Sequence, residues 1–171
     1  GDGWYVNEQP AHEVTLSAFE LDTNEVTASE YALFLNAACG ERCYHPSMPI
    51  TFEDGHYAVH SGFKNAPIAW VTWQDAHWYC IWAGKGLPSE AQWERAARGS
   101  EDAGWPWAGN MGPNCTLATY SYEGGRCRQA PQRIDNESTG VTDEGIKGLG
   151  GNVAEWVSDW WGPYGTEARS D

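Results

Sequence analysis

A chain of 171 residues, of which 41% are hydrophobic, is long enough to bury one core, and we interpret residues 1–171 as a single domain. Its formal net charge of −14, with only ten Lys and Arg, argues against nucleic acids and anionic membranes as partners, because both require clustered basic side chains. No apolar run approaches the roughly 20 residues of a membrane span. Eleven Trp and eight Tyr predict a core built from large amphipathic rings whose N–H and O–H groups need partners. Twenty Gly and nine Pro predict an irregular, loop-rich fold.

The first predicted elements are a strand and a helix. Apolar and polar residues alternate over His12–Asp22 and shift phase once, which predicts a strand with a bulge or break. Thr27 and Glu30 have the spacing of a capping box, and apolar residues follow at helical intervals. We therefore expect a helix from about Ala28 to Ala38.

A hairpin and a second helix are predicted next. Phe52–Val59 is centred on Asp54-Gly55, a dipeptide that tolerates positive φ in a two-residue turn. The apolar segment Ile68–Trp73 is typical of a short strand. It leads into a helix over about Gln74–Ala83, which Gly84 ends.

The C-terminal half combines one clear helix with a long irregular region. Ser89 and Gln92 form another capping box, which opens a third helix ending at Gly99. Ser100–Gly150 is rich in turn residues and is expected to be mostly loops, pinned by disulfides or metals. Asn152–Trp161 is predicted to be a core strand with both faces buried.

The five cysteines predict two local disulfides. Cys39 and Cys43 flank a short loop, Cys115 and Cys127 bracket a polar one, and Cys80 remains alone. This pairing implies an oxidising compartment, so we expect an extracytoplasmic or secreted protein. A metal site at Cys39 and Cys43 is the alternative, and it would need further soft ligands. Cys80 lies on an apolar helix face, which favours an inert structural thiol over a nucleophile.

Four segments resemble the formylglycine-generating-enzyme (sulfatase-modifying factor) family in their order and approximate spacing. The segments are FELDTNEVTASEYALFLN, PIAWVTWQDAHWYCIWAGKGLPSEAQWERAARG, WPWAGN and GLGGNVAEWVSDWW, at positions 19–36, 67–99, 105–110 and 148–161. The resemblance implies an α+β, C-type-lectin-like fold, here with three helices, short strands and long irregular loops.

The same resemblance bears on activity. Well-known members of the family oxidise a sulfatase cysteine to formylglycine with a copper ion held by two cysteines, which lie after the GNVxEW segment near an Arg-Gly-Gly-Ser-like stretch. Neither that stretch nor that cysteine pair occurs in these 171 residues. We therefore expect a domain that lacks the C-terminal segment of the family fold and acts as a non-catalytic, calcium-stabilised binding or scaffold module. The alternative is a copper-dependent oxidase completed by a second chain or a cleaved C-terminal segment.

Calcium is the cofactor that the resemblance implies for this chain. Gly151 and Val153 would contribute carbonyls and Glu155 a carboxylate, with Asn152 adjacent. Relatives often carry Asp or Asn where this chain has Gly148, so the site loses one side-chain oxygen. The other interpretation is that Asn152 and Glu155 only brace a turn.

A second calcium site would use Asn114 and the Cys115 carbonyl, with Glu123 as a shifted acidic ligand near Gly124. The partner is expected to be a protein or a glycan. Trp105 and Trp107 could stack on sugars, although burial in the core is the more common role of such rings.

Overall fold

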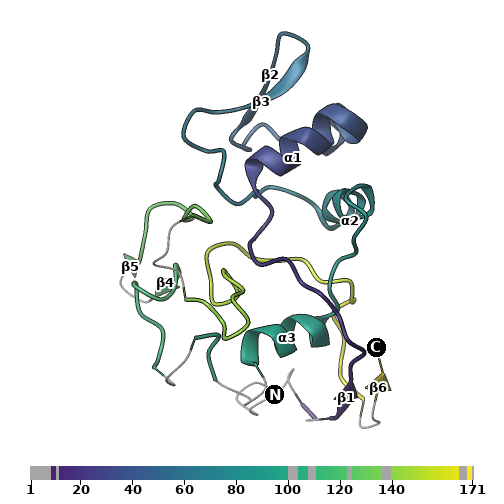
Figure 1. Cartoon of the computed structure of the whole chain (residues 1–171), viewed down its shortest axis with the longest axis vertical. Helices are drawn as coiled ribbons and strands as arrows, with labels where there is room; N and C mark the ends of the chain where they lie inside the picture. Colours follow the sequence, from purple (N-terminus) through teal and green to yellow (C-terminus); the bar gives the residue numbers. More distant parts are fainter. Residues whose placement is uncertain are drawn as a thin grey trace.

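The computed structural model describes residues 9–10, 12–99, 104–107, 111–122, 125–135, 140–165 and 169–170. This part of the chain contains three α-helices and short strands that pair two by two, which makes the fold α+β (Figure 1). The hairpin and α1 lie at one end of the molecule and α3 lies toward the other, with α2 between them. None of the described helices is long and apolar enough to cross a membrane.

The helix predicted near Ala28 begins at the expected residue, and it changes from α-helical to π-helical part-way along. α1 spans Ala28–Phe34, and a π-helical turn, η2, continues over Leu35–Cys39. The Thr27 hydroxyl accepts from the Glu30 amide at 3.2 Å, while the Glu30 carboxylate accepts from the Thr27 amide at 2.8 Å. This capping box pairs amide groups that the first turn leaves without helical partners.

A hairpin packs beside this helix. β2 (Ile50–Glu53) and β3 (His56–Val59) are antiparallel, and the predicted Asp54-Gly55 turn joins them with φ of 50° and 80°. Asn36, in η2, fixes the hairpin to the helix because its side-chain amide donates to the Tyr57 carbonyl at 2.9 Å and accepts from the Tyr57 amide at 2.8 Å.

Two further helices follow the hairpin. α2 spans Trp73–Trp82, behind a capping box of Thr72 and Asp75, and Gly84 follows it at φ 74°. α3 spans Glu90–Arg98 and is capped by Ser89, as the sequence predicted.

The remaining described elements are short. A 3₁₀ turn, η3, covers Gly40–Cys43. β4 (Ser121–Tyr122) pairs with β5 (Gly125–Arg126), and β1 (Val14–Thr15) pairs in parallel with β6 (Arg169–Ser170).

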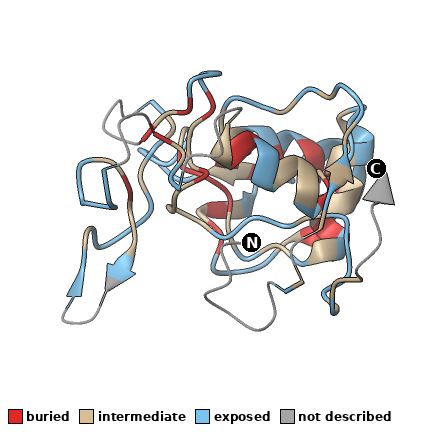
Figure 2. Ribbon diagram, turned by 90° about the horizontal axis from the view of Figure 1, so that it is seen from below, coloured by how far each residue is buried: buried red, intermediate tan, exposed pale blue. Residues whose placement is uncertain are grey.

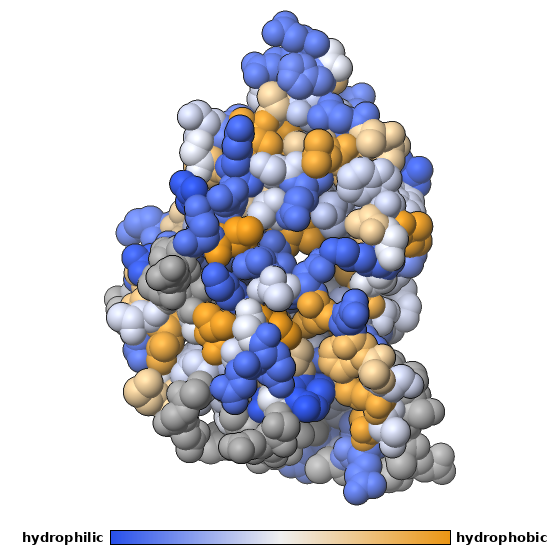
Figure 3. Space-filling model, viewed as in Figure 1, coloured by the Kyte–Doolittle hydropathy of each residue, from blue (hydrophilic) through white to orange (hydrophobic). Residues whose placement is uncertain are grey.

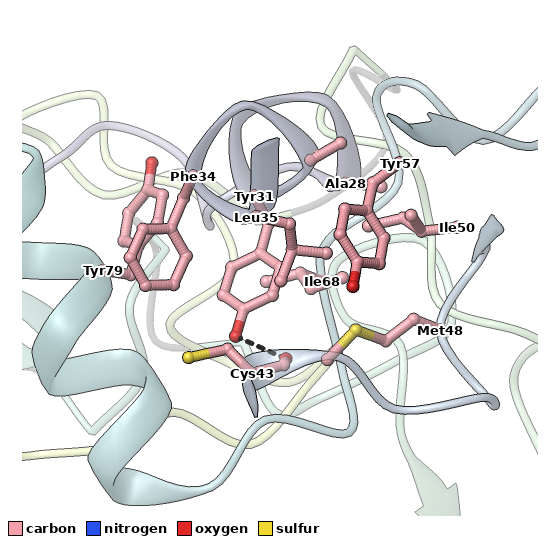
Figure 4. Close-up of a cluster of buried hydrophobic side chains, with 11 residues drawn as sticks. Ala28, Tyr31, Phe34, Leu35, Cys43, Met48, Ile50, Tyr57, Ile68 and Tyr79 are labelled. Carbon is pink, nitrogen blue, oxygen red and sulfur yellow. Dashed lines mark hydrogen bonds between the residues drawn. The ribbon is translucent and has the colours of Figure 1, made fainter. Parts of the chain in front are cut away.

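The main core lies under α1, and its buried aromatic rings come from tyrosine and phenylalanine rather than tryptophan. Tyr31, Phe34 and Tyr79 contact one another with ring centroids 5.4 to 5.8 Å apart (Figure 4). The Tyr31 hydroxyl donates to the Cys43 carbonyl at 3.1 Å, so its polar end is satisfied inside the core. Of the described tryptophans, only Trp107 is fully buried. Tyrosine therefore supplies the amphipathic rings predicted for the core, whereas the expectation that tryptophan would do so was wrong. Figure 2 shows the buried positions on the helices and on some of the loops.

Three strand predictions need correction. Asn152–Trp161 forms no strand: Asn152 takes φ 72°, and Trp160 is 92% exposed, so the segment is not buried on both faces. Ile68–Trp73 forms no strand, because only the Ile68 amide bonds to the neighbouring Val26 carbonyl and Trp70 takes φ 66°. The strand expected over His12–Asp22 is reduced to β1.

Candidate functional site

Asn152 organises the turn that the sequence marked as a calcium site. Its side-chain amide donates to Glu25 Oε2 at 2.7 Å and to the Gln132 carbonyl at 3.1 Å, and its Oδ1 accepts from the Gln132 amide at 2.6 Å. The Asn152 backbone amide donates to the Thr119 carbonyl at 2.8 Å. Asn152 therefore joins three distant segments, two through its side chain and one through its backbone, and its side-chain oxygen is already used as an acceptor.

Glu25 is the most perturbed carboxylate of this site. Burial raises its pKa to about 7, with a further rise from the charge of Glu155, while the hydrogen bond from Asn152 and the nearby Val153 amide oppose the shift. Its Oε1 is buried and has no hydrogen-bond partner among the described residues. A buried carboxylate oxygen without a partner is costly, so this position favours a bound proton or cation.

Glu155 lies close enough to affect Glu25 electrostatically. Its Oε2 accepts from the indole N–H of Trp93, on α3, at 2.6 Å. Partial desolvation raises the pKa of Glu155 and this hydrogen bond lowers it, although the residue as a whole is exposed. The turn thus brings together two carboxylates with raised pKa values, separated by 130 positions in the chain.

Two glycines leave space for this arrangement. A Cβ atom at Gly148 would lie 2.9 Å from Cδ of Glu25, and one at Gly151 would lie 2.5 Å from the Thr119 carbonyl oxygen. Both glycines have positive φ, at 89° and 154°. An acidic or amide side chain at Gly148 would therefore displace Glu25, which occupies the adjacent space instead.

The second predicted calcium site lies only partly within the described residues. Asn114 is exposed, and its Oδ1 accepts from the amide and hydroxyl of Thr116 at 3.0 and 2.5 Å. The proposed acidic ligand Glu123 and the neighbouring Gly124 lie outside the described residues. Over the whole described part of the chain, no three His, Cys, Asp or Glu side chains gather as metal ligands.

The cysteines follow the predicted pattern. Disulfides join Cys39 to Cys43 and Cys115 to Cys127, and Cys80 is free. Cys80 is half-buried on α2 rather than fully buried, and burial raises its pKa. A thiol with a raised pKa remains protonated at neutral pH and is a poor nucleophile.

Trp105 and Trp107 stack on each other with centroids 5.7 Å apart. Trp107 is buried, and its indole N–H donates to the Met111 carbonyl at 2.8 Å, so its role is structural.

The sequence interpretation missed Glu25. The available signal was an acidic residue directly before the apolar Val26 and the capping box of α1, in a segment that leads into the core.

Comparison with known proteins agrees with the motifs. The family model described as "Sulfatase-modifying factor enzyme 1-like domain" matches residues 2–170. The chain belongs to this family. Formylglycine-generating enzymes are among the relatives of the domain, including that of Thermomonospora curvata, which is 37% identical over 108 residues covering 57% of this chain and 34% of that protein.

Other relatives place the domain in different contexts. The serine/threonine-protein kinase Pkn1 of Chlamydia trachomatis serovar L2 is 31% identical over 94% of this chain, which corresponds to 26% of the kinase. The inactive C-alpha-formylglycine-generating enzyme 2 of Mus musculus is 32% identical over 95% of this chain and 65% of that protein. The chain thus spans about a quarter to a third of the length of the first relatives it matches.

Proposed function

We propose that this chain is a non-catalytic, calcium-stabilised binding or scaffold module of the sulfatase-modifying factor family, with a C-type-lectin-like arrangement. The observation that carries the proposal is the state of the cysteines. Four of the five are joined in disulfides, and the remaining Cys80 is a lone thiol with a raised pKa. These 171 residues therefore provide no thiol pair to hold copper.

The relatives support a module that works within a larger protein. Nearly all of this chain matches only about a quarter of the Chlamydia kinase, and the mouse relative is named as inactive. We infer an extracytoplasmic compartment, which two disulfides favour. A protein or a glycan is the proposed class of ligand for the module.

Calcium is proposed to bind at the turn that contains Glu155. The Gly151 and Val153 carbonyls and the Glu155 carboxylate are the proposed ligands, with Asn152 as the residue that holds the turn. Backbone carbonyl oxygens beside Glu25 and Glu155, two carboxylates with raised pKa values, suit a hard divalent cation. The ion would offset the repulsion between the two negative charges. Asn114 and Cys115 remain a second, weaker proposal.

The calcium proposal is tested by thermal unfolding of Glu155→Gln, with Glu53→Gln on β2 as the matched control. Wild-type protein should melt at a higher temperature in calcium than in chelator, because binding at a hundred times the dissociation constant adds about 2.7 kcal/mol to the free energy of unfolding. Glu155→Gln should lose most of this shift and Glu53→Gln should keep it. Identical melting of the wild type in calcium and in chelator would show that Glu155 only braces the turn.

A copper-dependent formylglycine-generating oxidase, completed by a further segment, is the second candidate, and the similarity to the Thermomonospora enzyme favours it. Intact-mass analysis of the native protein and sequencing of the gene beyond the codon for Asp171 separate the two candidates. Two cysteines in an Arg-Gly-Gly-Ser context, together with copper-dependent oxidation of a sulfatase cysteine peptide, would establish the oxidase and refute the non-catalytic role.

A further inference from the structure

A cavity of about 450 Å³ lies between the segment before α1, helix α2 and the turn that carries Glu155. This volume lies within the range of small-ligand sites, which combine apolar walls with a few convergent polar groups. Figure 3 shows hydrophobic and strongly hydrophilic side chains side by side across the middle of the face drawn there. The apolar part of the wall is formed by Leu21, Val26, Ile68, Val71, Leu149 and Val153.

The charges around the cavity are predominantly negative. Its acidic lining residues are Glu20, Asp22, Glu25 and Glu155, and its basic ones are Lys85 and Lys147. Lys85 is already paired, because its Nζ lies 2.7 Å from both carboxylate oxygens of Asp22. Lys147 Nζ donates to the Ile134 carbonyl at 3.5 Å. Within the described residues, neither Glu25 nor Glu155 has a salt bridge.

Glu25 gives this negative wall a specific anchor. The carboxylate is held in place by Asn152, which bonds to Oε2 at 2.7 Å and leaves Oε1 buried without a partner among the described residues. Gly148 packs directly against the Glu25 carboxyl group, because a Cβ at this position would lie only 2.9 Å from Glu25 Cδ. No described donor offsets the negative charge at Oε1, so a cation held in the cavity next to Glu25 would be attracted by this uncompensated carboxylate.

We propose that this cavity binds an organic cation, a guanidinium or ammonium group on an apolar stem, with the charged head at Glu25 and the stem along the apolar wall. A guanidinium has several N–H donors that match a carboxylate, and it is less strongly hydrated than an ammonium ion. A hard metal ion would gain nothing from the apolar side of the cavity. The inference goes beyond the proposed calcium site, because Glu25 is not among the ligands of that site.

The proposal is tested by calorimetric titration with n-butylguanidinium at pH 8 and low salt, in the presence of chelator. The neutral analogue n-butylurea and the surface variant Glu53→Gln serve as controls. We expect saturable binding by the wild type and Glu53→Gln, at least tenfold weaker binding by Glu25→Gln, and no binding of n-butylurea. Equal binding of the two probes, or unchanged affinity in Glu25→Gln, would overturn the proposal.

A second variant keeps the proposal testable if Glu25→Gln fails to fold. Ala76 lines the cavity from α2, and Ala76→Leu should occupy the space of the stem and weaken butylguanidinium binding at least tenfold while leaving all charges in place. Unchanged affinity in Ala76→Leu would also count against binding in this cavity.

The source of the cation is resolved with the peptide acetyl-Val-Arg-Val-amide and its Gln counterpart. Tighter binding of the Arg peptide than of butylguanidinium identifies a basic polypeptide side chain as the ligand, and the reverse order identifies a small free cation. Failure of both probes overturns the inference. The calcium-dependent shift in melting temperature is measured separately on the same samples. Glu25→Gln leaves the proposed calcium ligands in place, so this measurement tests the calcium site independently of the cation site.

Discussion

Glu25 is the residue whose chemistry depends most on its surroundings. Burial raises its pKa from the usual 4.5 to about 7, and the nearby charge of Glu155 adds to the rise. The Asn152 amide opposes the shift because its hydrogen bond favours the charged form. The folded protein therefore binds a proton at Glu25 over a pH range in which the unfolded chain has released it.

This proton predicts how stability changes with pH. Since the folded pKa lies above the unfolded one, the native state binds more protons between about pH 4.5 and 7, and the free energy of unfolding falls as the pH rises through this window. In chelator, Glu25 should make wild-type protein less stable at pH 8 than at pH 5, by at most about 3 kcal/mol.

Urea unfolding of the wild type and of Glu25→Gln at the two pH values measures this contribution. Because the glutamine does not titrate, the variant should show a smaller difference between pH 5 and pH 8. A pH dependence that is the same in both proteins would contradict the raised pKa.

At the scale of elements, short sequence signals determine most of the regular structure. Each of the three α-helices begins with a capping box, and in each case both partners lie within four consecutive residues. The β2–β3 hairpin likewise depends on its two-residue turn, where Asp54 and Gly55 both take positive φ. Glycine suits the second position because it has no Cβ to oppose that backbone conformation.

The hairpin turn can be tested by Gly55→Ala. At φ 80° an alanine is strained, so the free energy of unfolding should fall by about 1 kcal/mol, although no atom lies within 4 Å of the added methyl group. Gly112→Ala is the matched control, since it also meets no atom within 4 Å and its φ is not positive. Equal stabilities of the two variants in urea unfolding would indicate that the turn does not need glycine.

At the scale of the whole molecule, the described core consists of two separate clusters of buried side chains. The larger contains Tyr31, Phe34 and Tyr79, while the smaller contains Ala96 and Leu149. Among the described residues from Met111 to Arg126, the short β4–β5 pair is the only regular structure. The Cys115–Cys127 disulfide therefore has an important share in ordering it.

Replacing both Cys115 and Cys127 with serine should lower the free energy of unfolding by about 3 kcal/mol, because a loop of this length loses much of its unfolded-state entropy when it is closed. Chemical denaturation with and without reductant measures the effect. Reductant should destabilise the wild type more than the double variant, which retains only the Cys39–Cys43 bridge. Equal effects of reductant on both proteins would show that this bridge contributes no stability.

The sequence by itself determined the features whose partners lie close together in the chain. It located the three helices, the Asp54-Gly55 turn and both disulfides, and its motifs identified the family. In each helix cap the donor and the acceptor are three residues apart, so the pattern can be recognised without knowing the rest of the fold.

Only the tertiary structure decided where Asn152–Trp161 and the tryptophans lie. The indole N–H of Trp73 donates to the Val157 carbonyl, and that of Trp156 to the Val71 carbonyl, so these rings bind loops that are 84 and 85 residues away. The candidate site depends on a contact of the same kind, because Asn152 meets Glu25 across 127 residues. The spacing of apolar residues indicates which side chains prefer burial. It does not indicate which distant carbonyl or carboxylate will accept a hydrogen bond from an indole or amide group, because that partner is determined by how the chain packs on itself.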